Sequence, residues 1–208
     1  MALLYRATLH PTKLELLAEW LPTRSWYTEA TGEVDRVAGY RFDDPAGAVG
    51  VETLLVRHGG GPVYQVPMTY RDAPLEGAED RLLGTAEHSV LGRRWMYDAC
   101  ADPVYVTALA DAIAGRVAQA EEFVDVDGEP HRREPSMRVA ARTGEGPPAG
   151  AVERVVDGDP TLIVTATVEL AVVRRLTGAV GVAGAALTGT WEGQAEPLPL
   201  AYATVTAG

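Results

Sequence analysis

The chain has 208 residues, of which 47% are hydrophobic and 23% are charged, and it carries a formal net charge of −11. This balance is typical of a globular chain that buries a core, organised as one domain or as two small ones. So acidic a chain is a poor binder of nucleic-acid backbones and of anionic membrane surfaces, and we expect neither as a partner.

The chain has one cysteine and one lysine, and each count limits the chemistry. Cys100 has no partner for an internal disulfide, which favours a reducing compartment. The first residues show no secretory signal, so we expect a cytoplasmic protein. Lys13 is the only lysine, so any reaction that needs an amine side chain has one candidate.

The chain begins with a pattern of strand and short helix. A strand is expected at residues 3–9. The sequence LELLAEWL then repeats apolar residues at helical spacing until Pro22, which ends the helix. The residues expected on the buried face of this helix are Leu14, Leu17, Ala18 and Leu21.

A run of strands follows the first helix. These segments are rich in β-branched residues or alternate in period two, and the turn sequences DDPAG and HGGGP separate the first three. Successive antiparallel strands behind a single helix predict an α+β fold. The expected strands are Val37–Phe42, Val49–Arg57, Val63–Tyr70, Gly84–His88 and Arg93–Tyr97.

A second helix is expected to begin at Pro103. Asp102 is a suitable N-cap, and Pro103 fits the first helical position because the N–H that proline lacks is not needed there. This helix would bury an apolar face. The residues of that face are Val106, Leu109, Ala110, Ile113 and Val117.

The composition changes after the second helix. Residues 121–148 are rich in acids, Arg, Gly and Pro and are expected to form a linker or exposed loop. Short runs with β character follow, and VDGD (Val156–Asp159) predicts a hairpin turn. The expected strands are 138–142, 152–156, 162–170, 180–187 and 198–205. The predicted organisation is an α+β domain at residues 1–120, a linker at 121–135 and a smaller, mostly β unit at 136–208.

His88, Ser89 and Cys100 are the first candidates for catalysis, and each has a structural interpretation that we favour. Neighbouring strand residues point to opposite faces, so His88 cannot easily activate Ser89, and no G-x-S-x-G sequence surrounds the serine. Asp98 and Asp102 would raise the pKa of the Cys100 thiol if they lay close to it, which disfavours a nucleophilic thiolate. We therefore expect no catalytic residue among them.

The histidines give no metal-binding motif. His10, His58, His88 and His131 show no H-x-x-x-H spacing, and the chain has no C-x-x-C pair. We therefore expect no metal ion and no other cofactor.

Three further polar stretches are candidate sites. EGAED (residues 76–80) could pair an acid with a base, but it is more typical of a solvated loop. Arg93 and Arg94 could clamp an anion, but adjacent strand residues point apart. GEGPPAG (residues 144–150) has loop glycines, but Glu145 adds negative charge and the two prolines remove amide donors that a phosphate would need.

The segment VYQVPMTYRDAPLEGAEDRLLGTAEHSVLGRRWMYDACADPVYVTALADAI closely resembles the N-terminal cap region of actinobacterial maltokinases. TLHPTKLELLAEWLPTRSWY and GYRFDDPAGAVGVETLLVR are similar to the same region, so that the resemblance covers residues 1–118. It implies a curved antiparallel sheet with two helices, described as cystatin-like. In that family the cap precedes a kinase fold that phosphorylates maltose with ATP, and the cap carries none of the phosphoryl-transfer residues.

The rest of the chain departs from the family's kinase. The 208 residues leave no room for a kinase C-lobe, so we expect neither its catalytic aspartate nor its metal-binding residues. Glu153–Leu176 weakly resembles the N-lobe strand that carries the ATP lysine, but Thr165 stands near that position. Asp157 and Val164 stand where the family's catalytic loop has histidine and asparagine. The resemblance thus implies a vestigial N-lobe without enzyme activity.

Two functions are favoured over a third, an enzyme whose chemistry is carried by the cap. The first is a non-catalytic interaction or regulatory protein linked to maltose, trehalose or α-glucan metabolism, whose partner is a kinase, a glucan or trehalose enzyme, or a second copy of the chain. The second is a protein that binds a sugar or sugar phosphate, because sugar sites favour aromatic faces with a few polar groups. The ligand-binding residues expected between the two halves are Tyr64, Tyr70, Arg93, Trp95 and Trp191.

Overall fold

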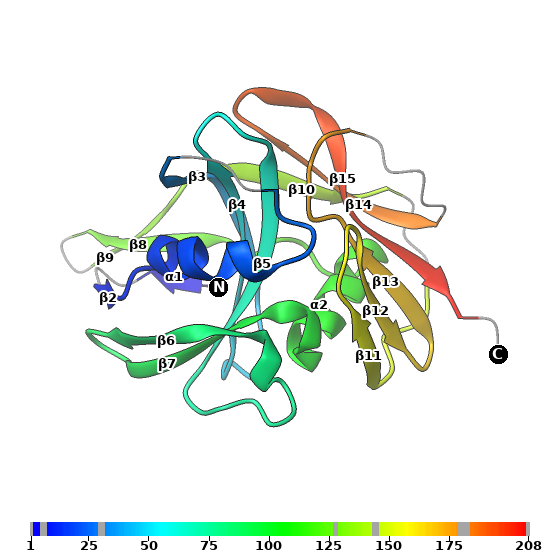
Figure 1. Cartoon of the computed structure of the whole chain (residues 1–208), viewed down its shortest axis with the longest axis horizontal. Coiled ribbons are helices and arrows are strands. Elements are labelled where there is room, and N and C mark those ends of the chain that lie inside the picture. The colour runs from blue at the N-terminus through cyan, green and yellow to red at the C-terminus, as the bar shows by residue number, and fades with distance from the viewer. Residues whose placement is uncertain are drawn as a thin grey trace.

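The computed structural model describes residues 2–4, 8–28, 32–126, 129–142, 146–178 and 184–206. In these ranges two α-helices lie among strands that form three sheets (Figure 1). The helices are α1 (Lys13–Trp20) and α2 (Pro103–Ile113), with single 3-10 turns at Leu21–Thr23, Glu79–Arg81 and Ala99–Ala101. The strands are β1 (Ala2–Leu4), β2 (Leu9–His10), β3 (Val34–Phe42), β4 (Gly50–His58), β5 (Val63–Arg71), β6 (Leu82–His88), β7 (Gly92–Asp98), β8 (Glu122–Val126), β9 (Glu129–Arg132), β10 (Met137–Ala141), β11 (Val152–Val156), β12 (Thr161–Thr165), β13 (Val168–Val172), β14 (Ala185–Trp191) and β15 (Gln194–Val205).

The first sheet is antiparallel throughout and curls into a half-barrel. Its strand order is β2-β6-β7-β5-β4-β3. Helix α1 packs on one face, against β3 and β6, and α2 lies on the opposite side of the sheet (Figure 1). This arrangement confirms the predicted antiparallel α+β pattern and the five strands expected between residues 37 and 97.

Helix α1 begins with a capping box. The Thr12 hydroxyl accepts a hydrogen bond from the Glu15 N–H, and the Glu15 carboxylate accepts one from the Thr12 N–H. The buried face consists of Leu16, Leu17, Trp20 and Leu21. The prediction of Ala18 on this face was wrong, since Ala18 is exposed. The large Leu16 and Trp20 side chains face the sheet in its place.

Helix α2 forms as predicted from its cap. The Asp102 carboxylate accepts a hydrogen bond from the Val104 N–H at 3.0 Å, and Pro103 is the first helical residue. Val106, Leu109, Ala110 and Ile113 are buried. The expected fifth residue of this face, Val117, lies beyond the helix end and is exposed, so that part of the prediction was wrong.

The second sheet is also antiparallel, with the strand order β10-β14-β15-β13-β12-β11. The hairpin predicted at VDGD joins β11 to β12. The single strand expected at 162–170 is two strands, because the chain turns back at Ala166 and Thr167. The strand expected at 180–187 begins outside the described residues, which resume at Gly184, and β14 starts at Ala185.

A small third sheet joins the start of the chain to the segment expected to be a linker. β8 and β9 pair antiparallel, and β1 pairs in parallel with β8. The prediction of a single strand at residues 3–9 was wrong. β1 belongs to this small sheet, whereas β2 lies at the edge of the first sheet. The domain boundaries predicted at 120 and 135 stay a prediction.

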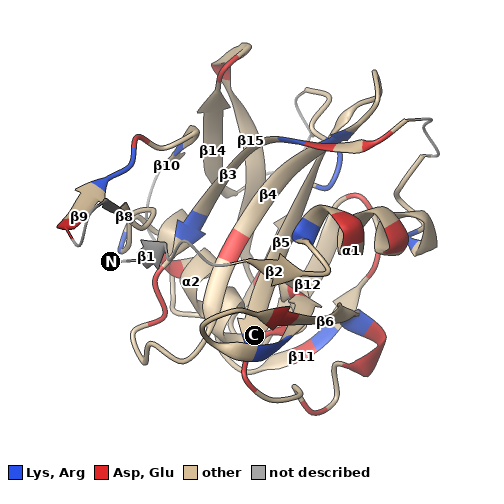
Figure 2. Ribbon diagram, turned by 90° about the vertical axis from the view of Figure 1, so that its left-hand side faces the viewer, with Lys and Arg blue, Asp and Glu red and all other residues tan. Residues whose placement is uncertain are grey.

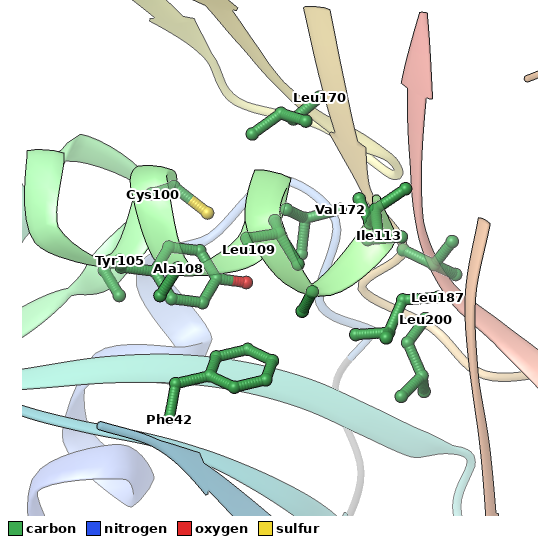
Figure 3. Packing of buried hydrophobic residues seen from close by; sticks show 14 of the residues in the cluster. Phe42, Cys100, Tyr105, Ala108, Leu109, Ile113, Leu170, Val172, Leu187 and Leu200 are labelled. Atoms are coloured by element: carbon green, nitrogen blue, oxygen red, sulfur yellow. The ribbon is translucent and has the colours of Figure 1, made fainter. Parts of the chain in front are cut away.

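The two large sheets share one hydrophobic core around α2. Figure 3 shows Tyr105, Leu109 and Ile113 of the helix between Phe42 of the first sheet and residues of the second. The second sheet contributes residues that are at most 1% exposed, namely Leu170, Val172, Leu187 and Leu200. A separate cluster under α1 consists of residues from the helix, from the segment that follows it and from the first sheet. Helix α2 therefore lies at the centre of the molecule.

Candidate functional site

The residues expected to line a ligand site do not converge. Tyr70 lies directly opposite Met96, whereas its neighbour Arg71 lies opposite Trp95, so Tyr70 and Trp95 are on different faces of the first sheet. Arg93 is exposed and its Nε donates to Glu87 Oε1 at 2.9 Å. Trp191 belongs to the second sheet, opposite Met137.

Tyr64 is fully buried in an aromatic cluster under α1. Its ring centroid is 6.0 Å from that of Trp26 and 5.1 Å from that of Tyr27. Its hydroxyl accepts a hydrogen bond from the Thr28 N–H at 3.0 Å. These contacts give Tyr64 a packing role that leaves its ring faces covered.

Tyr70 belongs to a charged cluster built on Glu52, which we call the Glu52 cluster. One carboxylate oxygen of Glu52, Oε2, lies 2.5 Å from Lys13 Nζ, 2.6 Å from the Tyr70 hydroxyl and 3.1 Å from Arg41 Nη2. Lys13 also lies 5.0 Å above the centre of the Tyr70 ring. Glu52 is only 3% exposed, so these three donors supply the contacts that water would otherwise make.

The elements of the first sheet bring these side chains together. Arg41 on β3 lies directly opposite Glu52 on β4, and Tyr70 lies near the end of the next strand, β5. Lys13 reaches them from the first residue of α1, after the capping box has fixed the start of that helix. Figure 2 shows the acidic segment of β4 beside the basic segment at the start of α1.

The charged groups of the Glu52 cluster shift one another's pKa values. Burial favours the neutral acid, but the Lys13 ammonium and the Arg41 guanidinium outweigh it and hold the pKa of Glu52 well below its usual range. Burial lowers the pKa of Lys13; Glu52 opposes that shift and Arg41 adds to it. Burial and the Glu52 charge raise the pKa of Tyr70.

A second polar network, the Arg174 network, crosses the junction between the two large sheets. Arg174 is 0% exposed and follows β13. Its Nη2 donates to Asp98 Oδ2 at 2.7 Å, and its Nε donates to Thr161 Oγ1 at 2.7 Å. The guanidinium carbon lies 4.9 Å above the Trp26 ring. Asp98 belongs to β7 of the first sheet and Thr161 to β12 of the second, so the hydrogen bonds of Arg174 connect the two sheets.

Asp157, in the predicted hairpin turn, extends this network toward α1. Its Oδ1 accepts from the Trp26 indole N–H at 3.2 Å and from Arg81 Nη1 at 3.3 Å. Its Oδ2 lies 3.7 Å from Arg24 Nη1. Arg81 Nη1 is also 3.7 Å from Asp98 Oδ2. Asp157 therefore anchors the β11–β12 hairpin to the loop after α1 and to the 3-10 turn that precedes β6.

Cys100 is buried next to the Arg174 network. Its sulfur lies 3.2 Å from Arg174 Nη2. Burial raises the pKa of its thiol, the Arg174 charge opposes this and the Asp98 charge adds to it, so that the pKa lies well above its usual value. Cys100 packs as a buried residue of the shared core.

The other candidate site residues of the sequence form hydrogen bonds mostly with the backbone. His88 Nδ1 accepts from the Val90 and Leu91 N–H groups, and Ser89 Oγ accepts from the Thr8 N–H. Glu79 accepts from the Gly77 N–H. Residues 144 and 145 of the glycine-rich stretch lie outside the described residues. In the described ranges no group of three or more His, Cys, Asp or Glu side chains is placed to hold a metal ion.

An open groove of about 420 Å³ lies at one end of the second sheet. Its lining combines an aromatic ring, hydroxyls and one charge of each sign, and consists of Pro135, Ser136, Met137, Arg138, Thr190, Trp191, Glu192 and Ala195. The Ser136 hydroxyl accepts from the Gly39 N–H at 3.0 Å and lies 3.1 Å from the Gly39 carbonyl oxygen. The groove therefore adjoins the edge of the first sheet.

Few features of the sequence point to the Glu52 cluster and the Arg174 network. Glu52 is a charged residue within the apolar strand VGVETLLVR, and such a residue needs a buried partner. That signal could have drawn attention to Glu52 and to the only lysine. Arg174 follows an apolar strand in the same way, but 76 residues separate it from Asp98.

No helix in the described ranges is long and apolar enough to cross a membrane. Comparison with curated proteins returns no match. The strands of the first sheet from β3 to β7, with Glu52, Tyr70 and Asp98, lie within residues 20–102, and this part of the chain matches the family model of the maltokinase N-terminal cap domain.

Proposed function

We propose that this chain is a cytoplasmic, non-catalytic interaction or regulatory protein that works beside the enzymes of maltose, trehalose or α-glucan metabolism. The match of residues 20–102 to the maltokinase cap supports the metabolic setting. In this proposal the second sheet is a vestigial kinase N-lobe held on the cap. Its partner is a maltokinase, a glucan or trehalose enzyme, or a second copy of the chain.

The contacts of three residues support the absence of phosphoryl transfer. This reaction needs a cation on the phosphates, a metal site and a base. Thr165, near the position of the family's ATP lysine, donates its hydroxyl to the Val168 carbonyl at 2.8 Å and closes the β12–β13 turn. Asp157 is held by Trp26 and Arg81. Lys13 is held by Glu52 on the first sheet.

A kinase assay combined with a binding assay tests this proposal. The purified chain is incubated with ATP, magnesium and maltose, with a maltokinase as positive control, and phosphorylated sugar is measured. We expect no product above the blank. The chain is then titrated against that maltokinase and against trehalose and glucan enzymes, and both complex formation and kcat/KM are followed. Phosphorylated product, or the absence of binding to every one of these enzymes and to itself, would contradict the proposal.

The groove at Trp191 favours sugar or sugar-phosphate binding as a second function. Its volume of about 420 Å³ suits a small ligand, and a half-buried indole beside Arg138 and Thr190 offers an apolar face with polar groups around it. Calorimetric titration with maltose, trehalose, glucosamine and their phosphates should show binding that Trp191→Ala removes. Trp95→Ala is the matched control, because Trp95 lies on the other large sheet. Titrations that show no heat of binding would exclude sugar and sugar-phosphate binding as a function.

A further inference from the structure

The turn between β6 and β7 presents two adjacent apolar side chains to solvent. Val90 is 58% exposed and Leu91 is 47% exposed. The turn lies at the periphery of the molecule, at the end of the β6–β7 hairpin (Figure 1). The Ser89 hydroxyl accepts from the Thr8 N–H at 3.0 Å, and the Ser89 N–H donates to the Thr8 carbonyl at 3.0 Å. The turn is therefore tied to the segment before β2 and presents its apolar pair in one position.

His88 closes this turn through a single ring nitrogen. Its Nδ1 accepts from the Val90 N–H at 3.2 Å and from the Leu91 N–H at 3.1 Å. A ring nitrogen accepts hydrogen bonds only while it carries no proton, so the imidazole that makes both bonds is neutral and has its proton on Nε2. A second proton would place an N–H on Nδ1, opposite two N–H donors. Both hydrogen bonds therefore depend on the protonation state of one side chain.

Two cations face the same imidazole. Arg94 on β7 lies opposite Ala86, which puts it on the same face of the hairpin as His88. The charge of Lys13, at the start of α1, also acts on the ring. Burial and then the charges of Arg94 and Lys13 lower the pKa of His88 from its ordinary value of 6.5. These neighbours favour the neutral imidazole that the turn requires.

The other titratable groups near His88 lie on β6, β7 and β2. Glu87 precedes His88 and points to the opposite face of β6, where its Oε1 accepts from Arg93 Nε at 2.9 Å. On β2, Leu9 lies opposite His88 and His10 lies opposite Glu87. The adjacent carboxylate is thus engaged by an arginine on the other face of the hairpin and does not offset the two cations that face the imidazole.

We propose that His88 is a pH-dependent switch for the turn between β6 and β7. The neutral imidazole holds the turn closed, and protonation opens it and releases Val90 and Leu91 from their fixed position. Since the pKa of His88 is lowered in the closed turn, the open turn binds the proton more readily. The stability that His88 gives to the turn is therefore present above the ordinary value of 6.5 and is lost as the pH falls through the lowered pKa. The switch acts on the free chain, so it does not depend on which partner the proposed function has.

Nuclear magnetic resonance of the labelled chain tests the switch. The titration of His88 is followed in the folded chain and in the same chain unfolded in urea. Hydrogen exchange of the Val90 and Leu91 amides is expressed as protection relative to an unstructured chain at the same pH. We expect His88 to titrate at lower pH in the folded chain, and the protection of both amides to fall at least about threefold from about one pH unit above its midpoint to about one below. Constant protection, or an equal or higher midpoint in the folded chain, would overturn the proposal.

Three variants show whether His88 itself is responsible. His88→Asn places an oxygen where Nδ1 lies, and this oxygen accepts from both N–H groups without titrating in this range, so protection should not depend on pH. His88→Ala should leave both amides weakly protected at every pH. His131→Gln, at an exposed histidine on β9, is the matched control and should behave as the parent chain. Circular dichroism shows that each variant is folded. The parent's pH dependence in His88→Asn, or full protection in His88→Ala, would refute the switch.

Discussion

Arg174 shows at the scale of one residue how the two large sheets are held in place. Its side chain is 0% exposed and bonds Asp98 from β7 and Thr161 from β12. Its own N–H donates to Asp159 Oδ1 at 2.8 Å, and its carbonyl accepts from the Gln65 N–H at 2.7 Å. A buried charge with this many partners specifies one docking of the sheets, because a shifted docking would leave it unpaired.

Replacing this arginine should therefore destabilise the chain strongly. We expect Arg174→Met to lower the free energy of unfolding by about 3–5 kcal/mol, because Asp98 would stay buried with a single hydrogen bond from the Cys100 N–H and with Arg81 3.7 Å away as its remaining cation among the described residues. Urea denaturation followed by tryptophan fluorescence measures the loss. Arg154→Ala serves as the exposed control. Adding Asp98→Asn to the Arg174→Met variant should restore part of the lost stability. Fully additive effects of the two substitutions would contradict the Arg174–Asp98 ion pair.

The Glu52 cluster predicts how stability depends on pH. The pKa of Glu52 is lowered in the folded chain from an ordinary value of 4.5, so below that value the unfolded chain binds a proton that the folded chain does not. The stability due to Glu52 is therefore present above the ordinary pKa and is lost as the pH falls below it. Urea denaturation between about pH 7 and pH 3 should show a shallower acid-side loss for Glu52→Gln than for the parent chain. If the stability of the two chains fell in parallel with pH, the predicted role of Glu52 would be contradicted.

At this scale local features can be predicted from the sequence, whereas contacts between distant residues cannot. Asp102 and Pro103 are adjacent, and their capping roles follow from residue type alone. The Lys13–Glu52 contact joins residues 39 positions apart, and Arg174 meets Asp98 across 76. Nothing in a single sequence fixes such pairings. The five residues expected to line a site were chosen for their chemistry, which carries no information on which face of which sheet they occupy.

At the scale of the element, Asp102 serves two structures at once. Its Oδ1 caps α2 through the Val104 N–H. Both carboxylate oxygens also bind Arg71 of β5, each at 2.7 Å. The same side chain thus begins the helix and fixes it to the first sheet, which places the apolar face of α2 against the shared core.

Two substitutions at this position separate the cap from the ion pair. Asp102→Asn keeps an oxygen that can cap the helix but loses the charge opposite Arg71, whereas Asp102→Ala loses both. We expect Asp102→Ala to cost about 1 kcal/mol more than Asp102→Asn, which is the usual contribution of an N-cap. Thermal and urea denaturation of the two variants give the difference. Equal costs would mean that the cap contributes nothing here.

Strand positions followed from composition more readily than their pairing did. β3, β4, β5 and β7 were predicted within a few residues, since alternation and turn residues mark them. The helix face was misjudged at Ala18 because a small side chain satisfies the helical spacing as well as a large one. The register shift after Arg36 had no signal in the residues, since a bulge is set by the partner strand.

At the scale of the whole molecule, the shared core decides how the chain unfolds. Leu170 and Leu200 of the second sheet pack in the same cluster as Phe42 of the first and Leu109 of α2 (Figure 3). Removing either sheet would expose this apolar surface to water. The second sheet therefore contributes to the stability of the first, even though the two have separate strand ladders.

We therefore expect a single cooperative unfolding transition. Tryptophan fluorescence and far-ultraviolet circular dichroism should give coincident urea curves. A fragment of residues 1–120 should be less stable than the full chain by several kcal/mol, because the core around α2 loses one wall. Two separated transitions, or a fragment as stable as the full chain, would show instead that the predicted domains at 1–120 and 136–208 fold independently.

The strand order of the second sheet also has a consequence for synthesis on the ribosome. β15 lies between β14 and β13, although it is the last of the six strands along the chain. The first sheet ends at Asp98 and can assemble while later residues are still being translated. Until residues 194–205 emerge, β13 and β14 each present an unpaired edge that no earlier strand fills. Closure of this sheet is thus a late event, and a nascent chain paused before Gln194 is a substrate for chaperones that bind exposed strands.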